Sequence, residues 1–318
     1  MYYKRLGYLI SLTVTGFLFV MILDATRAHA DTINKIEWPK QGARHLMSNR
    51  QTIASNQIDS ISETVSPAIN NPNFINSEES SSDMLDQDGI GICIENECKF
   101  YGYDILLWHN IVNDKIGETP IMVYYNDKYG ISAVYNRETN GDILNFKNSN
   151  KLWQGLQLIS SSEDLSKESL WSPTLGEAVS GVRVRQQLSG LSFQSQELKE
   201  WLLDHPSSRI LSRHTGFIRP YGANFETLPI TEKPQDKRLT GGTTVIGLFF
   251  NSRFIAIPLE TLPIGKSEFI VNKEKLSVSK YVNNKIGLES NKYIGNAPSI
   301  ISNWTAWSRL HPSTIILK

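Results

Sequence analysis

Apolar and polar residues alternate in short runs along most of the chain beyond about residue 88, a period typical of β-strands. The first two runs, 90–94 and 99–103, flank the turn residues Glu95 and Asn96 and predict a β-hairpin. Residues 121–125 and 131–135 predict two more strands. The same pattern predicts a further hairpin around Asn140 and Gly141 and strand structure within 175–184.

A helical period first occurs at residues 196–204, where Leu198, Trp201 and Leu202 share one face. Ser195 precedes this run as a candidate N-cap, and Pro206 ends it because proline cannot continue a helix. We therefore predict a short helix here.

The first hairpin has a counterpart near the C-terminus. Residues 246–254 again begin with Ile-Gly and alternate in the same way. Phe249 and Phe254 face each other across the turn at the positions that Cys93 and Cys98 hold in the first hairpin.

The end of the first block also recurs. Trp201, His205 and the following proline reappear with the same spacing as Trp307, His311 and the following proline. We interpret both histidines as structural residues near helix C-termini. The pattern predicts a mostly β, α+β fold with two unequal internal repeats of strand hairpins, each closed by a short helix. The expected ranges are 88–220 for the larger repeat, 221–243 for a linker and 244–318 for the shorter repeat.

The N-terminus has the sequence pattern of an export signal. Lys4 and Arg5 precede an apolar run that ends at Leu23, and Ala28 and Ala30 occupy the positions that a signal peptidase reads. We predict a signal peptide over 1–30 with cleavage after Ala30, and a periplasmic or secreted mature protein. The alternative is that the apolar run stays uncleaved as a membrane anchor.

Residues 31–87 are rich in Ser, Asn, Gln, Glu and Asp and contain few aromatic residues. Such a composition buries little apolar surface to offset the entropy lost on ordering. We predict a disordered polar tether between the signal and the domain.

The chain contains two cysteines, Cys93 and Cys98. In the predicted hairpin they face each other at a non-hydrogen-bonded pair, where side chains approach most closely. An oxidising compartment lets a disulfide persist there, so we predict a cross-strand disulfide. Two free thiols on neighbouring strands are the alternative.

Composition narrows the possible partners. The 318 residues include 32 Lys and Arg against 32 Asp and Glu, which leaves no basic excess for binding nucleic acid. Glycine-rich phosphate loops, nucleophile elbows and zinc-protease motifs do not occur in the sequence, so we predict no metal and no cofactor.

The densest run of side chains that could take part in catalysis or binding follows Trp108. His109 can act as a base, an acid or a ligand near neutral pH, and Asn113 and Asp114 offer an amide and a carboxylate close by. The same Asn and Asp also suit an ordinary turn. We expect His109, Asn113 and Asp114 to line the candidate site, with His109 and Asp114 as the candidate catalytic pair.

The loop after 121–125 supplies further candidates. Tyr125 and Asp127 border it, and Arg137 lies just beyond the next strand. Loops on a rigid sheet often carry function, although a polar turn also accounts for these residues. We include Tyr125, Asp127 and Arg137 as candidate ligand-binding residues.

Five blocks resemble one bacterial family, that of domain of unknown function 3179. They are Trp108 to Asp114, Pro120 to Arg137, Ser169 to Gly181, Trp201 to Pro206 and the closing Trp304 to Pro312. The resemblance extends from about residue 90 to the C-terminus. It implies an exported or anchored bacterial protein and no particular reaction.

This chain departs from the family pattern in three places. The family's C-P-L-C run is Asn126 to Tyr129 here, its glutamate after the histidine is Asn110, and its Y-D-R run is Glu163 to Leu165. These losses favour a non-enzymatic module that binds a ligand or protein of the cell envelope. The alternative is a metal-assisted or acid–base enzyme centred on His109 and Asp114.

Overall fold

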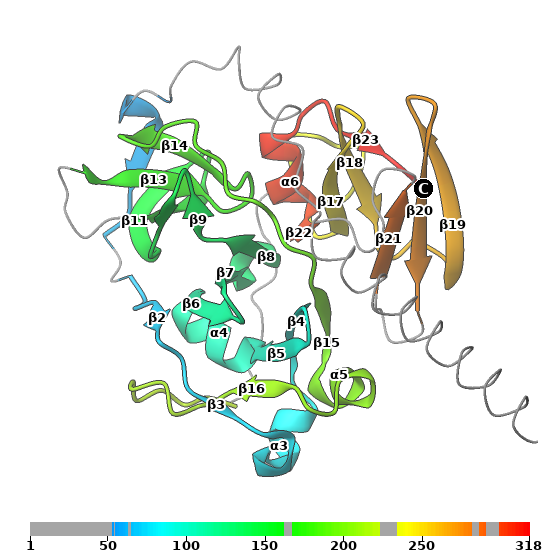
Figure 1. Cartoon of the computed structure of the whole chain (residues 1–318). Helices are drawn as coiled ribbons and strands as arrows, with labels where there is room; N and C mark the ends of the chain where they lie inside the picture. Colours follow the sequence, from blue (N-terminus) through cyan, green and yellow to red (C-terminus); the bar gives the residue numbers. More distant parts are fainter. Residues whose placement is uncertain are drawn as a thin grey trace, which may run out of the picture. The chain divides into compact units, whose positions relative to one another are not determined.

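The computed structural model describes residues 53, 55–62, 65–161, 167–222, 234–281, 286–290 and 299–318. The predicted signal peptide, residues 31–52, Glu163 to Leu165 and residues 223–233 lie outside these ranges. Strands dominate the described part, which confirms the mostly β, α+β class (Figure 1). The helical elements are α3 (Ser82–Leu85), α4 (Tyr103–His109), α5 (Leu198–Asp204), α6 (Trp304–Leu310) and the 3-10 turns η1 (Ser55–Gln57), η2 (Ser77–Glu79) and η3 (Asp127–Tyr129). None of the described helices has the length and apolar character needed to cross a bilayer.

The described strands form five sheets. The largest has the order β2 (Ile69–Asn70), β6 (Ile111–Ile116), β7 (Thr119–Asn126), β8 (Ile131–Asn136), β22 (Ile300–Asn303), β17 (Thr244–Phe250), β18 (Arg253–Pro258) and β23 (Ile315–Ile316). A second has the order β15 (Gln194–Glu197), β4 (Asp88–Ile94), β5 (Glu97–Gly102), β16 (Arg209–Leu211) and β3 (Phe74–Ile75). A third has the order β1 (Ile58–Ser60), β11 (Lys147–Trp153), β12 (Leu156–Ser160), β13 (Ser169–Ser172) and β14 (Glu177–Gly181). The two smallest are β19 (Gly265–Val271), β20 (Glu274–Lys280) and β21 (Ile286–Ser290), and the pair β9 (Glu138–Thr139) and β10 (Asp142–Ile143).

Strands β6, β7 and β8 are buried on both faces. Val112, Val123 and Val134 lie opposite one another across the three strands and pack into one core cluster. Met122 and Tyr135, one position along, pack into a second cluster on the other face. Because side chains alternate between the two faces, each core receives every second residue. This arrangement explains why the sequences of these strands, above all that of β7, are apolar almost throughout.

The first hairpin has the predicted register. Cys93 pairs with Cys98 across β4 and β5, their Cα atoms lie 4.1 Å apart, and their sulfurs form a disulfide. Glu95 in the turn adopts a positive φ of 53°. The predicted disulfide is therefore present. Since such bonds persist in oxidising compartments, it indicates a location outside the cytoplasm.

The second hairpin also has the predicted register. Phe249 faces Phe254 across β17 and β18, and their rings meet edge to face with centroids 5.1 Å apart. In both hairpins a tryptophan ring packs on a strand glycine: Trp201 covers Gly91, and Trp307 covers Gly247. Only a residue without Cβ allows so close an approach of ring and backbone.

Two predicted element boundaries are wrong. Helix α5 begins at Leu198, and Ser195 does not cap it, because Ser195 pairs with Ile90 within β15 and β4. Glu197 holds the N-cap position, and its side chain makes no capping hydrogen bond. The run 175–184 is strand only over β14, with turns on both sides.

The prediction of a disordered tether is wrong for its second half. Ile69 pairs in parallel with Val112 and is almost fully buried, and the Phe74 ring meets Tyr101 edge to face at 5.8 Å. Met84 of α3 lies in the core cluster around Trp201. Isolated apolar residues therefore fix this polar segment, because each one docks into a core formed by later parts of the chain.

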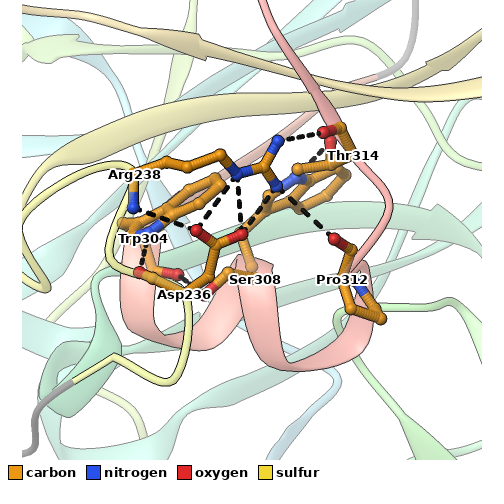
Figure 2. A network of polar contacts seen from close by, with 7 residues as sticks. Asp236, Arg238, Trp304, Ser308, Pro312 and Thr314 are labelled. Carbon is orange, nitrogen blue, oxygen red and sulfur yellow. Dashed lines mark hydrogen bonds and ion pairs between the residues drawn. The ribbon is translucent and has the colours of Figure 1, made fainter.

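Part of the predicted linker is also fixed. The Arg238 guanidinium lies against the Asp236 carboxylate, and its Nη2 is 2.6 Å from Oδ2. Figure 2 shows that the guanidinium also lies beside Pro312 and Thr314 of the C-terminal segment. Arg238 Nη1 donates to the Thr314 carbonyl at 2.9 Å, and Trp304 Nε1 donates to the Asp236 carbonyl at 2.7 Å. The guanidinium also lies over the Trp304 ring at 5.5 Å. These contacts hold residues 236–238 against α6.

Candidate functional site

His109 is fully buried at the C-terminal end of α4. Its Nδ1 lies 2.8 Å from the Pro67 carbonyl oxygen, and its Nε2 lies 2.5 Å from the Tyr221 hydroxyl. Because a carbonyl can only accept, Nδ1 carries the proton and Nε2 accepts from Tyr221. The Tyr221 hydroxyl lies in turn 2.6 Å from Thr215 Oγ1. Both ring nitrogens of His109 are therefore engaged by protein groups.

The stability of the fold should depend on pH through His109. Burial lowers the pKa of His109, and the positive charge of Arg219 adds to this effect, whereas the hydrogen bond to Pro67 opposes it. In the unfolded chain the ring binds a proton near its ordinary pKa of about 6.5. As the pH falls through that value the unfolded state binds more protons than the folded state, so stability decreases.

We expect the free energy of unfolding to fall between about pH 7 and pH 5 more steeply for the wild type than for His109→Gln. Urea unfolding at several pH values measures both slopes. Asp88 and the other titrating groups are present in both proteins, so the difference between the two slopes measures the contribution of His109. Equal slopes would contradict a buried, neutral imidazole.

Asp114 lies on the other side of β6 from Asn113 and away from the histidine. Its Oδ2 accepts from Lys99 Nζ at 3.1 Å and from the Tyr101 hydroxyl at 2.6 Å. Burial and then the Asp114 charge raise the pKa of Tyr101 well above its ordinary value, so the hydroxyl stays a donor. Among the described residues no hydrogen bond or ion pair joins His109 to Asp114.

Asn113 connects strands rather than facing a cavity. Its Nδ2 donates to the Asn70 side chain at 2.8 Å and to the Phe146 carbonyl at 2.7 Å. Its Oδ1 accepts from the Phe146 backbone at 3.0 Å. The amide thereby links β6 to β2 and to the segment that precedes β11.

Arg137 is buried and bonds mainly to backbone carbonyls. Its Nε donates to Ile121 at 2.8 Å, its Nη1 to Leu144 at 2.6 Å and its Nη2 to the Asp114 carbonyl at 3.0 Å. Asp127 is exposed in the turn η3. The structure thus brings Arg137 to the backbone of Asp114 and leaves Asp127 apart.

Tyr125 packs against a residue that lines a groove. Its ring stacks on Tyr103 with centroids 4.1 Å apart, and Tyr103 lines a groove of about 900 Å³. The Tyr103 hydroxyl lies 2.7 Å from Ser195 Oγ and 2.9 Å from Ser132 Oγ. These bonds fix the ring at the groove wall.

Carboxylates occupy one side of this groove. Asp88 and Glu197 are cross-strand partners in β4 and β15, and Glu200 follows on α5. Burial, and then the charge of Glu197, raise the pKa of Asp88 above its ordinary value. Apolar side chains from later strands face the same space, among them Ile246 and Ile301. The groove therefore combines negative charge with apolar surface.

Sequence reasoning missed these groove residues. Asp88 and Glu197 are 109 positions apart (197 − 88) and meet through the pairing of β15 with β4. Ser195 suggested a helix cap, although it bonds to Tyr103. All four residues of β15 are polar, so no alternation of apolar and polar residues marks this strand in the sequence.

A smaller cavity of about 60 Å³ lies between Tyr135, Leu188, Leu248 and Trp307. Its lining is mostly apolar, and Glu177 and His311 also contribute. Its volume admits only a few atoms, so the larger groove is the better candidate for a ligand.

Comparisons with known proteins identify one family. The family described as protein of unknown function (DUF3179) matches residues 64–289. No curated protein and no solved structure matches the chain significantly.

Proposed function

This chain belongs to the DUF3179 family, and we propose that it is a non-enzymatic binding protein of the cell envelope. Its ligand site is the groove bordered by Asp88, Tyr103 and Glu197. The observation that carries the proposal is the size of this groove together with its fixed polar wall. Binding sites of several hundred Å³ with a few oriented polar groups suit small molecules.

The wall supports a preorganised site. Tyr103 is held by two serine hydroxyls and by the stacked Tyr125 ring, so little side-chain freedom remains to be lost on binding. Ser195 and Glu197 sit on β15, whose pairing with β4 fixes their spacing. Sites on paired strands keep their geometry better than sites on loops.

The lining indicates the class of ligand. Asp88, Glu197 and Glu200 attract positive charge, whereas Ile246 and Ile301 favour an apolar part. A small organic amine with an apolar tail satisfies both. Lys199 already bonds Glu197 at 2.8 Å, so a ligand ammonium would share or displace that contact.

The acid–base enzyme centred on His109 and Asp114 has less support. Nε2 of His109 accepts from Tyr221, and Asp114 bonds Lys99 and Tyr101. A general base must reach a substrate proton, and a carboxylate partner must orient it. Neither condition is met by these contacts.

A thermal-shift experiment tests the groove. Hexylamine, in excess over its dissociation constant, should raise the Tm of the wild type by about 2–4 °C, the effect of roughly 1 kcal/mol of binding in a protein of this size. The variant Asp88→Asn/Glu197→Gln should lose the shift because its carboxylates are neutralised.

Two controls complete this test. Hexanol has the same tail without the charge and should give a smaller shift. The variant Glu118→Gln removes a carboxylate whose side chain is 97% exposed outside the groove, and its response should match the wild type. Equal shifts in all three proteins would contradict the proposed site.

Export is part of the same proposal. The charged start, the apolar run and the Ala28-His29-Ala30 ending support a signal peptide, cleaved after Ala30 or retained as an anchor. The Cys93–Cys98 disulfide is consistent with the periplasmic or secreted location that we propose.

We also infer that the two hairpin blocks arose as unequal repeats. Trp201 Nε1 donates to Ser208 Oγ at 2.8 Å, and Trp307 Nε1 donates to Thr314 Oγ1 at 3.1 Å. After each helix a strand pairs in parallel with the second strand of its hairpin: β16 with β5, and β23 with β18. The same side-chain bond at the same place in two blocks supports duplication.

A further inference from the structure

The disulfide of the first hairpin has a histidine beside it. Nδ1 of His205 lies 3.6 Å from the Cys93 sulfur and 3.7 Å from the Cys98 sulfur. These three potential ligand atoms all lie within 4.8 Å of one another, and all three residues are partly exposed. His205 follows α5, its backbone N–H donates to the Trp201 carbonyl at 2.9 Å, and its ring packs on the Trp201 ring at 4.0 Å. The imidazole is therefore held in place independently of the sulfurs.

The second hairpin gives an internal comparison. His311 occupies the corresponding place after α6 and packs on Trp307 at 4.1 Å and on Phe254 at 3.9 Å. There the imidazole faces an apolar ring instead of two sulfurs. The scaffold thus places a histidine over both hairpins, and the first hairpin alone provides it with metal-binding partners.

We infer that Cys93, Cys98 and His205 form a redox-gated metal site, which binds Zn²⁺ when the disulfide is reduced. Two thiolates and one imidazole nitrogen are ligands that zinc prefers, and three protein ligands leave one position open for water or another donor. This inference is independent of the groove, because none of the three residues lines it.

The distances suit such a site. Tetrahedral zinc with Zn–S bonds of about 2.3 Å and a Zn–N bond of about 2.1 Å separates nitrogen from each sulfur by about 3.6 Å. His205 Nδ1 already stands at that separation from both sulfurs. Once the S–S bond is broken, the two sulfurs need only rotate apart on adjacent strands to admit the ion.

The chemistry balances with a dithiol as reductant. A thiolate of the dithiol attacks one cystine sulfur and breaks the S–S bond, and its second thiol then releases the mixed disulfide. The dithiol becomes a disulfide, and Cys93 and Cys98 gain two electrons and two protons as thiols. Zn²⁺ then replaces both thiol protons, which pass to solvent.

Metal titration of the full chain tests the inference. The protein is reduced with a phosphine under nitrogen, then titrated with Co²⁺ and with Zn²⁺ in competition with a chelating dye. We expect one ion per chain, tetrahedral Co²⁺ absorption with thiolate charge-transfer bands, and no such binding by the oxidised protein. Cys98→Ser should abolish tight binding, and His205→Ala should weaken it by at least about 100-fold, since even outer-shell changes cost 10–100-fold.

Controls separate this site from adventitious binding. His214→Ala removes an exposed histidine outside the cluster and should bind as the wild type does. Equal zinc uptake by the reduced and oxidised wild type would overturn the inference, as would unchanged affinity in folded His205→Ala. If His205→Ala does not fold, X-ray absorption of the zinc-loaded wild type decides. Two sulfurs and an imidazole nitrogen support the site, and a shell without that nitrogen refutes it.

Discussion

Asp114→Ala is expected to lower the free energy of unfolding by about 3–5 kcal/mol. Asp114 and Lys99 form an ion pair at 3.1 Å with side chains that are 9% and 10% exposed. Removing the carboxylate leaves the buried Tyr101 hydroxyl without its acceptor. The Lys99 ammonium loses its nearest counter-ion and keeps the Lys115 carbonyl at 2.7 Å and the partly exposed Glu97 carboxylate at 3.6 Å. Urea unfolding of the wild type and the variant measures the difference.

Strand β6 and the turn that follows it provide a matched control. Lys115 and Glu118 form a shorter ion pair of 2.7 Å, but the Glu118 side chain is 97% exposed. Glu118→Ala should therefore change stability by less than about 0.5 kcal/mol. The double variant Lys99→Met/Asp114→Leu removes both charges and should be more stable than Asp114→Ala alone. A loss in Glu118→Ala as large as that in Asp114→Ala would show that burial is not the cause.

Gly247→Ala is expected to cost about 3 kcal/mol, the upper part of the usual range for overpacking. A methyl group on Gly247 would overlap the Trp307 indole, which is itself almost fully buried. Either the ring or the strand must shift, and both are fixed by the sheet and by the Trp307–Thr314 hydrogen bond. Thermal and urea unfolding should both report the loss.

Gly242 provides the comparison, because a methyl group there would meet nothing within 4 Å. Gly242→Ala should leave stability within about 0.5 kcal/mol of the wild type. In Gly247→Ala/Trp307→Phe the smaller ring leaves space for the methyl group. The loss of stability in this double variant should therefore be smaller than the sum of the losses in the two single variants. Full additivity would mean that contact between the methyl group and the ring is not the source of the loss.

The local parts of the fold could be predicted from the sequence. Turn residues fix hairpin register, so the pairing of Cys93 with Cys98 and of Phe249 with Phe254 follows from counting positions. The helix around Trp201 follows from spacing and from Pro206. These features depend on neighbours within a few residues.

Long-range pairing explains what the sequence did not reveal. Ile69 is ordered by a parallel bridge to Val112, and a two-residue strand has no detectable period. Likewise Tyr221 reaches His109 from 112 positions away, which turns a candidate base into a hydrogen-bonded core residue. The groove depends on contacts of the same kind, between residues that are far apart in the chain.

The bridge between β8 and β22 has a consequence for biosynthesis. Ser132 pairs with Ile301, 169 positions later (301 − 132), whereas residues 134–136 of the same strand bond to residues 189–191. The first half of β8 therefore lacks this neighbour until synthesis reaches β22. An exposed strand edge can pair with other chains, and distant pairings form slowly. A nascent chain that ends before β22 is therefore expected to need a chaperone that prevents aggregation, and this need should last until β22 has emerged.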